Sequence, residues 1–271
     1  GFDCAEDKDA TFVYGIHPDG NNHPGGAYLA GWPVNLKSLT GCYSDSIDFV
    51  QEGVSPPVIM PVEGKNRVVT SSVGNSPQVI DGDGTIVRGL SLACASDACK
   101  PNPPYFPGDG LTATITGQGG AGDLLGTGKP NFVQSVVGAI STQGAVGGST
   151  AGEAALGQSY EKAWDVDTGE VVQGFPARQD GFSFFDAPLV AGLQSTPATS
   201  QRAAVEANDS SWIHAYQPDG TEAPGFPKYV GQRPAFSGVV SDPTFDGPIR
   251  MAYGTREGYL LEWNVQGAQE T

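Results

Sequence analysis

Residues 211–228 read SWIHAYQPDGTEAPGFPK, and this stretch contains the pattern from which the fold can be predicted. A short apolar and aromatic run leads into Pro-Asp-Gly at 218–220, and the stretch then closes on Gly-Phe-Pro-Lys at 225–228. Asp-Gly favours a tight hairpin because glycine, and often aspartate, accepts a positive φ, and a proline after an aromatic residue suits an edge strand. The stretch therefore predicts a strand, a hairpin turn and a short outer strand that runs through the Gly-aromatic-Pro segment.

The same pattern recurs along the chain. Gly-aromatic-Pro also occurs at 31–33 and 174–176, each time after a hairpin-turn sequence, and weaker copies lie at 79–90 and 260–267. The turn glycines fall at positions 20, 84, 169, 220 and 267, which fits a repeat of about 50 residues with two insertions. Such a period is typical of propellers and other repeat architectures.

Each repeat contains short apolar or alternating runs of strand length. The runs at 187–191, 203–207 and 211–216 are repeated in order at 236–240, 249–254 and 259–263. Three such strands and one outer strand make a four-stranded antiparallel sheet, which cannot bury both faces alone and must stack on its neighbours. We predict an all-β fold, a β-propeller of four-stranded antiparallel blades with about four to five blades in this chain.

The first blade is incomplete, because the sequence starts shortly before an outer hairpin and lacks the two inner strands that should precede it. We therefore expect residues 1–271 to be a single β-propeller domain or the C-terminal part of a larger propeller. Aromatic residues recur at equivalent repeat positions, which favours packing between blades over a sugar-binding role. These residues are Trp32, Trp164, Trp212, Trp263, Phe175 and Phe226.

Composition restricts the class of protein further. The 271 residues include 39 glycines and 21 prolines, which makes long helices unlikely to form, and the formal net charge of −16 opposes binding to nucleic acid or anionic lipid. No apolar run reaches the 18 residues that a membrane span needs. We expect neither a nucleic-acid partner nor a membrane span.

Four cysteines allow three disulfide pairings. Cys94 and Cys99 lie close enough in sequence to form a disulfide within one loop, which leaves Cys4 and Cys42 as the second pair. Free thiols and a metal site are the less favoured alternatives, since the spacing typical of zinc sites is missing. Two disulfides point to a secreted, extracellular or cell-surface protein.

The repeat resembles the extracellular propellers of the FG-GAP (VCBS) and PQQ-like repeat superfamily. Residues 122–132 are similar to the FG-GAP turn, and residues 163–171 are similar to the outer hairpin of the PQQ-like repeat. The resemblance implies that Asp123 and Asn131 could hold calcium, although the intervening family positions lack acidic side chains here. A plain turn closed by Asp123 is the alternative. We expect no required cofactor, with calcium as the one candidate.

Two insertions, near 91–109 and 141–160, are long enough to bind a partner or to serve as spacers. The sequence indicates no catalytic residue. It has no complete Gly-x-Ser-x-Gly elbow, and its three histidines lie in or beside turns, where we expect them to be surface residues of hairpins. We predict a non-catalytic binding or assembly module that engages protein or glycan through blade-connecting loops, with a second polypeptide supplying the missing blades as a further candidate partner. The alternative is a propeller from an extracellular enzyme that acts on polysaccharide or uses a quinone.

Overall fold

The secondary structure consists almost entirely of antiparallel strands. The computed structural model describes residues 12–36, 55–71, 77–90, 114–138, 158–180, 183, 186–193, 202–208, 210–234, 237–241, 249–264 and 269–270. Within these residues the helical structure is a single 3₁₀ turn, η1 (Gly20–Asn22), and none of the helical structure is long or apolar enough to cross a membrane. The absence of long helices agrees with the glycine and proline content.

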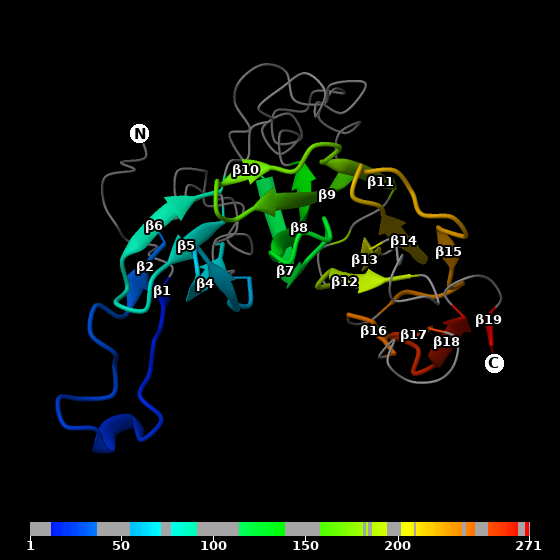
Figure 1. Cartoon of the computed structure of the whole chain (residues 1–271). Coiled ribbons are helices and arrows are strands. Elements are labelled where there is room, and N and C mark those ends of the chain that lie inside the picture. Colours follow the sequence, from blue (N-terminus) through cyan, green and yellow to red (C-terminus); the bar gives the residue numbers. More distant parts are fainter. Residues whose placement is uncertain are drawn as a thin grey trace, which may run out of the picture.

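The strands form sheets that follow one another in chain order along an arc (Figure 1). A two-stranded sheet at one end pairs β1 (Phe12–Val13) with β2 (Val34–Asn35). The next sheet contains β3 (Val58–Val62), β4 (Lys65–Thr70), β5 (Gln78–Ile80) and β6 (Ile86–Gly89). The third contains β7 (Thr114–Gly122), β8 (Asn131–Gly138), β9 (Gln158–Asp165), β10 (Glu170–Val171) and β11 (Ala177–Asp180).

Two further four-stranded sheets complete the row. The fourth sheet contains β12 (Leu189–Gly192), β13 (Arg202–Ala207), β14 (Trp212–Tyr216) and β15 (Lys228–Tyr229). The fifth contains β16 (Val239–Val240), β17 (Arg250–Gly254), β18 (Leu260–Asn264) and β19 (Gln269–Glu270). In each of these two sheets every strand is hydrogen-bonded to the next strand along the chain. This is the strand order of propeller blades, so the predicted fold class is confirmed, and the first sheet contains two strands among the described residues.

The three Gly-aromatic-Pro segments adopt the same turn. Each glycine has a positive φ, of 82°, 97° and 84° at Gly31, Gly174 and Gly225. The amide of each following aromatic residue donates to the carbonyl three residues earlier, in the pairs Trp32–Leu29, Phe175–Val172 and Phe226–Ala223. A positive φ at the third position of such a turn is the type II geometry, which requires glycine there.

These turns divide the outer strand into two pieces. A bridge or short strand precedes each turn and a second short strand follows it. The turn at Gly31 lies between the bridge Ile16–Tyr28 and β2, and the turn at Gly174 lies between β10 and β11. The turn at Gly225 lies between the bridge Tyr216–Glu222 and β15. The prediction that the outer strand runs through the segment was therefore wrong. The left-handed glycine and the missing proline N–H both interrupt the ladder.

The turn glycines lie against the hairpin of the following blade. A Cβ at Gly174 would lie 2.1 Å from the carbonyl oxygen of Asp219, and one at Gly220 would lie 2.0 Å from the carbonyl oxygen of Gly174. Gly31 meets Asp83 and Gly84 in the same way. The predicted turn glycines 20, 84, 169 and 220 all have positive φ, while Gly267 lies outside the described residues. Gly31 and Gly174 thus need to be glycine for two reasons: the turn requires a positive φ, and the neighbouring hairpin leaves no room for a Cβ.

Hydrophobic cores fill the boundaries between successive sheets. Val13 and Val34 meet Ile80, Val79 meets Trp164, Phe175 meets Tyr216, and Ile213 meets Trp263, so four clusters join the five sheets in order. Trp32, Trp164, Trp263, Phe175 and Phe226 all belong to these boundaries, as predicted. Trp212 differs, because it is half-buried and packs on Tyr229, with ring centroids 4.8 Å apart, within its own sheet.

Two predicted boundaries need correction. No Gly-aromatic-Pro segment follows the last repeat at 260–267, so the sequence predicts that the last sheet ends after its third strand, but β19 pairs with β18 as a fourth strand. The insertion predicted at 141–160 ends earlier than expected, because residues 158–160 begin β9 and Tyr160 is buried. The remainder of that insertion, and the other from 91 to 109, lie outside the described residues.

Candidate functional site

An arm extends from the first sheet between β1 and β2 (Figure 1). Strand alternation turns Val13 toward the second sheet, where it is buried, and leaves Phe12 and Tyr14 on the opposite face. Tyr14 and Tyr28 are 53% and 51% exposed, and their ring centroids lie 5.7 Å apart. One end of the row of sheets therefore presents aromatic side chains to solvent.

The other end of the row also has an apolar outer face. In the fifth sheet, Trp263 packs toward the fourth sheet, while Val239 and Leu260 are 64% and 77% exposed. Both residues belong to strands of that sheet, and an ion pair between Arg250 and Glu262 lies beside them at 2.9 Å. The two end sheets thus each bury one face and expose apolar side chains on the other.

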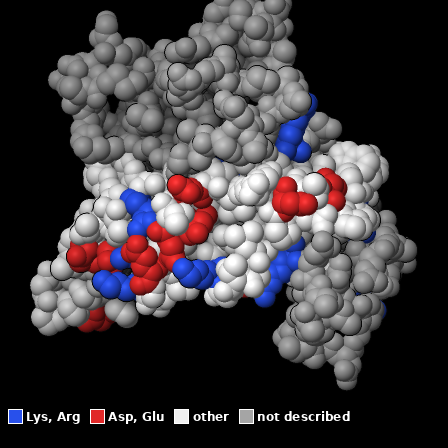
Figure 2. Space-filling model, turned by 45° about the horizontal axis from the view of Figure 1, so that its top comes forward, with Lys and Arg blue, Asp and Glu red and all other residues white. Residues whose placement is uncertain are grey.

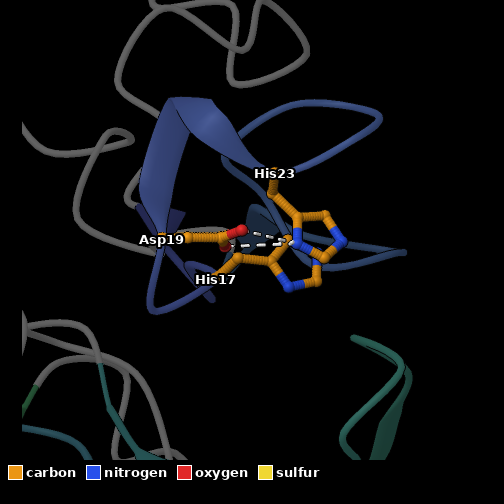
Figure 3. A group of neighbouring side chains, drawn as sticks. All are labelled: His17, Asp19 and His23. Atoms are coloured by element: carbon orange, nitrogen blue, oxygen red, sulfur yellow. Dashed lines mark hydrogen bonds and ion pairs between the residues drawn. The ribbon is translucent and has the colours of Figure 1, made fainter.

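The tip of the arm brings together His17, Asp19 and His23 (Figure 3). One ligand-type atom from each residue lies within 4.8 Å of the others, and within the described part of the chain no other set of three His, Cys, Asp or Glu side chains meets this criterion. Both carboxylate oxygens of Asp19 lie 3.2 Å from Nδ1 of His23. The two imidazole rings stack, with centroids 3.5 Å apart and planes inclined by 11°.

Backbone hydrogen bonds fix this loop. Glycines with positive φ at positions 20, 25 and 26 allow its sharp bends. Five backbone amides donate to backbone carbonyls within it, written here as donor to acceptor: His17 to Ala27, Gly20 to His17, Asn22 to Asp19, His23 to Gly20, and Gly26 to His23. Sequence reasoning placed these histidines in turns correctly, but it missed that η1 folds them onto one carboxylate. The His-x-Asp-x₃-His spacing was the available signal.

A second group of ionisable side chains is buried where the third, fourth and fifth sheets meet. Glu161 on β9 and Glu206 on β13 are fully buried, and Asp186, just before β12, is 5% exposed. Gln179 donates to Oε2 of Glu206 at 2.8 Å, and the amide of Ala207 donates to Oδ2 of Asp186 at 2.7 Å. We call Glu161, Asp186 and Glu206 the buried carboxyl cluster.

The acids of this cluster have few hydrogen-bond donors. Among the described residues, no donor group reaches either carboxyl oxygen of Glu161, one oxygen of Glu206 or one of Asp186, and the Glu161 and Glu206 carboxyls hydrogen-bond one another. Burial raises the pKa of Glu161 well above its usual range, and the neighbouring Glu206 adds to the effect. Burial also raises the pKa of Asp186 to about 8, and it raises the pKa of Glu206 as well. These groups are therefore suited to hold protons in the folded protein at neutral pH.

A charge network that extends from buried Arg67 to exposed Lys129 lies between the second and third sheets and has the opposite character. Glu63 accepts from Arg67 at 2.6 Å and from Arg88 at 2.5 Å, while Asp167 accepts from Lys129 and from the amide of Glu63, both at 2.7 Å. Figure 2 shows acidic and basic side chains interleaved on the side of the molecule where Figure 1 places β4 to β6. We call Glu63, Arg67, Arg88, Lys129 and Asp167 the paired charge network.

The candidate calcium residues are placed close to the turn after β7. Oδ1 and Oδ2 of Asp123 accept from the amides of Thr127 and Gly128 at 2.8 and 2.9 Å, and Oδ2 also pairs with Arg202 at 2.5 Å. Asn131 is buried, and its amide nitrogen donates to the carbonyl of Trp164 at 3.4 Å. Asp123 thus closes a wider turn, through amides four and five residues further along the chain, and contacts a guanidinium, and calcium at this site stays a prediction.

The remaining predicted site residues divide into two groups. Cys4, Cys42, Cys94 and Cys99 lie outside the described residues, so their pairing stays a prediction. His214 does not decorate a hairpin as expected: it lies within β14, is 7% exposed, and its Nδ1 is 2.9 Å from Oε2 of Glu222. Strand alternation places it on the same face of β14 as Trp212 and Tyr216, and its ring stacks on that of Tyr216 with centroids 5.7 Å apart.

The chain matches no protein-family model and no curated protein sequence. Among solved structures, it is similar to the BBS1N chain crystallised in complex with ARL6DN, at 10% identity and a TM-score of 0.43 over 80% of this chain and 52% of that one. The designed protein Ika4 gives 13% identity and a TM-score of 0.43 over 78% of this chain and 91% of that one.

The quinohemoprotein alcohol dehydrogenase ADHIIG from Pseudomonas putida HK5 is similar over 90% of this chain and 42% of that one, at 11% identity and a TM-score of 0.46. The chain therefore spans about half of the BBS1N chain and less than half of the dehydrogenase. Because each of these TM-scores is below 0.5, the likenesses do not bear on what this chain binds or does.

Proposed function

We propose that this chain is a secreted, non-catalytic propeller module of the FG-GAP and PQQ-like type whose function is to bind another protein. The supporting observation is the exposure of apolar side chains on the outer faces of both end sheets, through Tyr14 and Tyr28 at one end and Val239 and Leu260 at the other. Apolar side chains that are exposed together on one face of a sheet are typical of an interaction site.

The partner proposed for these faces is a polypeptide that presents further antiparallel sheets. Each boundary between successive described sheets contains an apolar cluster, such as the one that joins Ile213 to Trp263. The outer faces at the two ends continue the same type of surface, so a sheet that packed on them would bury Tyr14 or Leu260 in the way that its inner neighbours are buried. Such a partner would supply the blades that the sequence lacks.

Site-specific crosslinking tests this proposal. A photoreactive side chain placed at position 14 or 260 of the full chain, expressed in its native host, should crosslink to one defined second polypeptide. The matched control is position 59, since Ile59 is 72% exposed but belongs to β3 in the interior of the row. Equal crosslinking from all three positions, or a chain whose crosslinks stay within itself, would contradict the proposal.

Two other results would redirect the assignment. Saturable binding on a glycan array that is unchanged by Tyr14→Ser and Leu260→Ser would favour a glycan partner held by the loops. Turnover of polysaccharide, or of a substrate in the presence of an added quinone and calcium, would replace the binding module with the enzyme alternative.

A further inference from the structure

We propose that His17, Asp19 and His23 form a binding site for one divalent transition-metal ion, with zinc as the reference ion. Two imidazole nitrogens and a carboxylate oxygen are ligands that borderline ions such as Zn²⁺, Ni²⁺ and Cu²⁺ prefer, whereas Ca²⁺ and Mg²⁺ prefer oxygen alone. The three ligand-type atoms already lie within 4.8 Å of one another. This inference does not rest on the proposed protein-binding function.

The loop places the three side chains together before any ion binds. His17 and His23 flank η1, and hydrogen bonds from Gly20 to His17 and from His23 to Gly20 link its ends. Asp19 occupies the N-cap position of η1, yet its side chain makes no capping hydrogen bond. Its carboxylate faces His23 instead, so binding an ion would not remove a bond that the turn needs.

Only a small rearrangement separates the present geometry from a coordinated one. Zinc bonds of about 2.0–2.2 Å in a tetrahedral site place ligand atoms roughly 3.4 Å apart, so separations of up to 4.8 Å have to contract by at most about 1.4 Å. An ion must also lie near the plane of each imidazole that binds it, and the stacked rings cannot meet this condition together. One ring has to rotate, and the 36% exposure of the His23 side chain leaves room for that.

The electrostatic surroundings favour a cation at this place. The chain has a formal net charge of −16, and Asp19 contributes an exposed carboxylate whose described partner is His23. Three protein ligands leave the fourth position of a tetrahedral ion open toward solvent. Water would occupy that position in the isolated chain, and a histidine or carboxylate of a bound protein could replace it.

The test is a zinc titration of the full chain by calorimetry, after its accessible thiols have been blocked. We expect one ion per chain, with affinity reduced at least tenfold by His17→Gln, by Asp19→Asn and by His23→Gln. The matched control is His214→Gln, because His214 has a carboxylate partner, Glu222, but no second imidazole beside it. This control should leave zinc affinity unchanged.

A second measurement keeps the proposal falsifiable if a variant fails to fold. Paramagnetic Cu²⁺ added to the unmodified chain should broaden the NMR signals of residues 17–23 first and leave those of residues 212–216 sharp. The proposal is overturned by zinc binding that does not saturate below millimolar concentration, by equal affinity in the His17→Gln, His23→Gln double variant, or by broadening centred elsewhere in the chain.

Discussion

The buried carboxyl cluster and the paired charge network place similar acids in opposite surroundings. Both lie at boundaries between sheets, but Glu63 and Asp167 contact Arg67, Arg88 and Lys129, whereas no basic side chain or amide among the described residues donates to Glu161. The hydrogen bond from Lys129 lowers the pKa of Asp167, and that from Arg67 lowers the pKa of Glu63. Burial raises the pKa of each acid in the buried cluster.

This difference shows that an acidic residue can stabilise a blade boundary only in the protonation state that its surroundings favour. In the paired charge network the ionised form of each acid is favoured because opposite charges and backbone amides contact its carboxylate. In the buried cluster the neutral form is favoured because the loss of hydration on burial outweighs the hydrogen bonds that Gln179 and the amide of Ala207 donate. The two regions should therefore respond to pH with opposite signs.

The largest expected effect is a loss of stability as pH rises from about 5 to about 8. The pKa of Asp186 rises from 3.8 to about 8 on folding, so within this window the folded chain holds a proton that the unfolded chain has lost. Each such group lowers the free energy of unfolding by about 1.4 kcal/mol per pH unit. Glu161 and Glu206 shift in the same direction and add to the slope.

Urea denaturation at half-unit pH steps measures this slope. Acids of the paired charge network do not oppose it, because their lowered pKa values put their titration below the window. A free energy of unfolding that stays level or increases between pH 5 and pH 8 would mean that the buried acids are ionised in the folded chain and are compensated by a cation.

The second prediction isolates one member of the cluster. Glu161→Gln keeps the shape of the side chain but cannot ionise, so it should stabilise the protein at pH 8 by the order of 2 kcal/mol and reduce the pH slope. At pH 5 it should have little effect. The control is Glu170→Gln in the same sheet, since Glu170 is exposed on β10 and its substitution should change neither quantity. Destabilisation by Glu161→Gln at pH 8 would refute the neutral form.

The strands and turns of this fold can be predicted from local sequence. The buried carboxyl cluster and the group formed by His17, Asp19 and His23 mostly cannot. The run at 203–207 predicts β13 within one residue, because apolar length and flanking turn residues are local properties. The division of the outer strand was missed because the turn at Gly174 packs against Asp219 of the next blade, a contact that no local pattern records.

The buried cluster depends on three segments that are distant in the chain. Glu206 does stand inside an apolar run, which is a signal for burial, but Asp186 and Glu161 have no comparable mark in the sequence. The group at His17 is different, since all three residues lie within seven positions. Its spacing was visible, and what sequence reasoning lacked was the 3₁₀ turn that brings His23 back to Asp19.

The third prediction tests the opposite sign in the paired charge network. Asp167→Asn removes the ion pair with Lys129 but keeps an acceptor for the amide of Glu63, so the loss at pH 7 should be about 1 kcal/mol or less. The contribution of Asp167 is present above its unfolded pKa, near 4, and is lost as pH falls through its lowered folded pKa. The variant and the parent chain should therefore converge in urea denaturation once the pH lies below that lowered folded pKa, and a constant difference at all pH values would contradict the ionic origin.

The smallest effect is expected for Lys129→Ala, and its dependence on salt matters more than its size. Nζ of Lys129 is exposed and 2.7 Å from Asp167, so the pair is screened by solvent and by dissolved ions. At low ionic strength the ratio of folded to unfolded chain should fall by a few-fold at most, and near 1 M salt, where the Debye length is about 3 Å, the variant should match the parent. Glu161→Gln should keep its effect at high salt, because the buried cluster is shielded from ions by the surrounding sheets. If salt removed both effects equally, burial would not be the property that distinguishes the two regions.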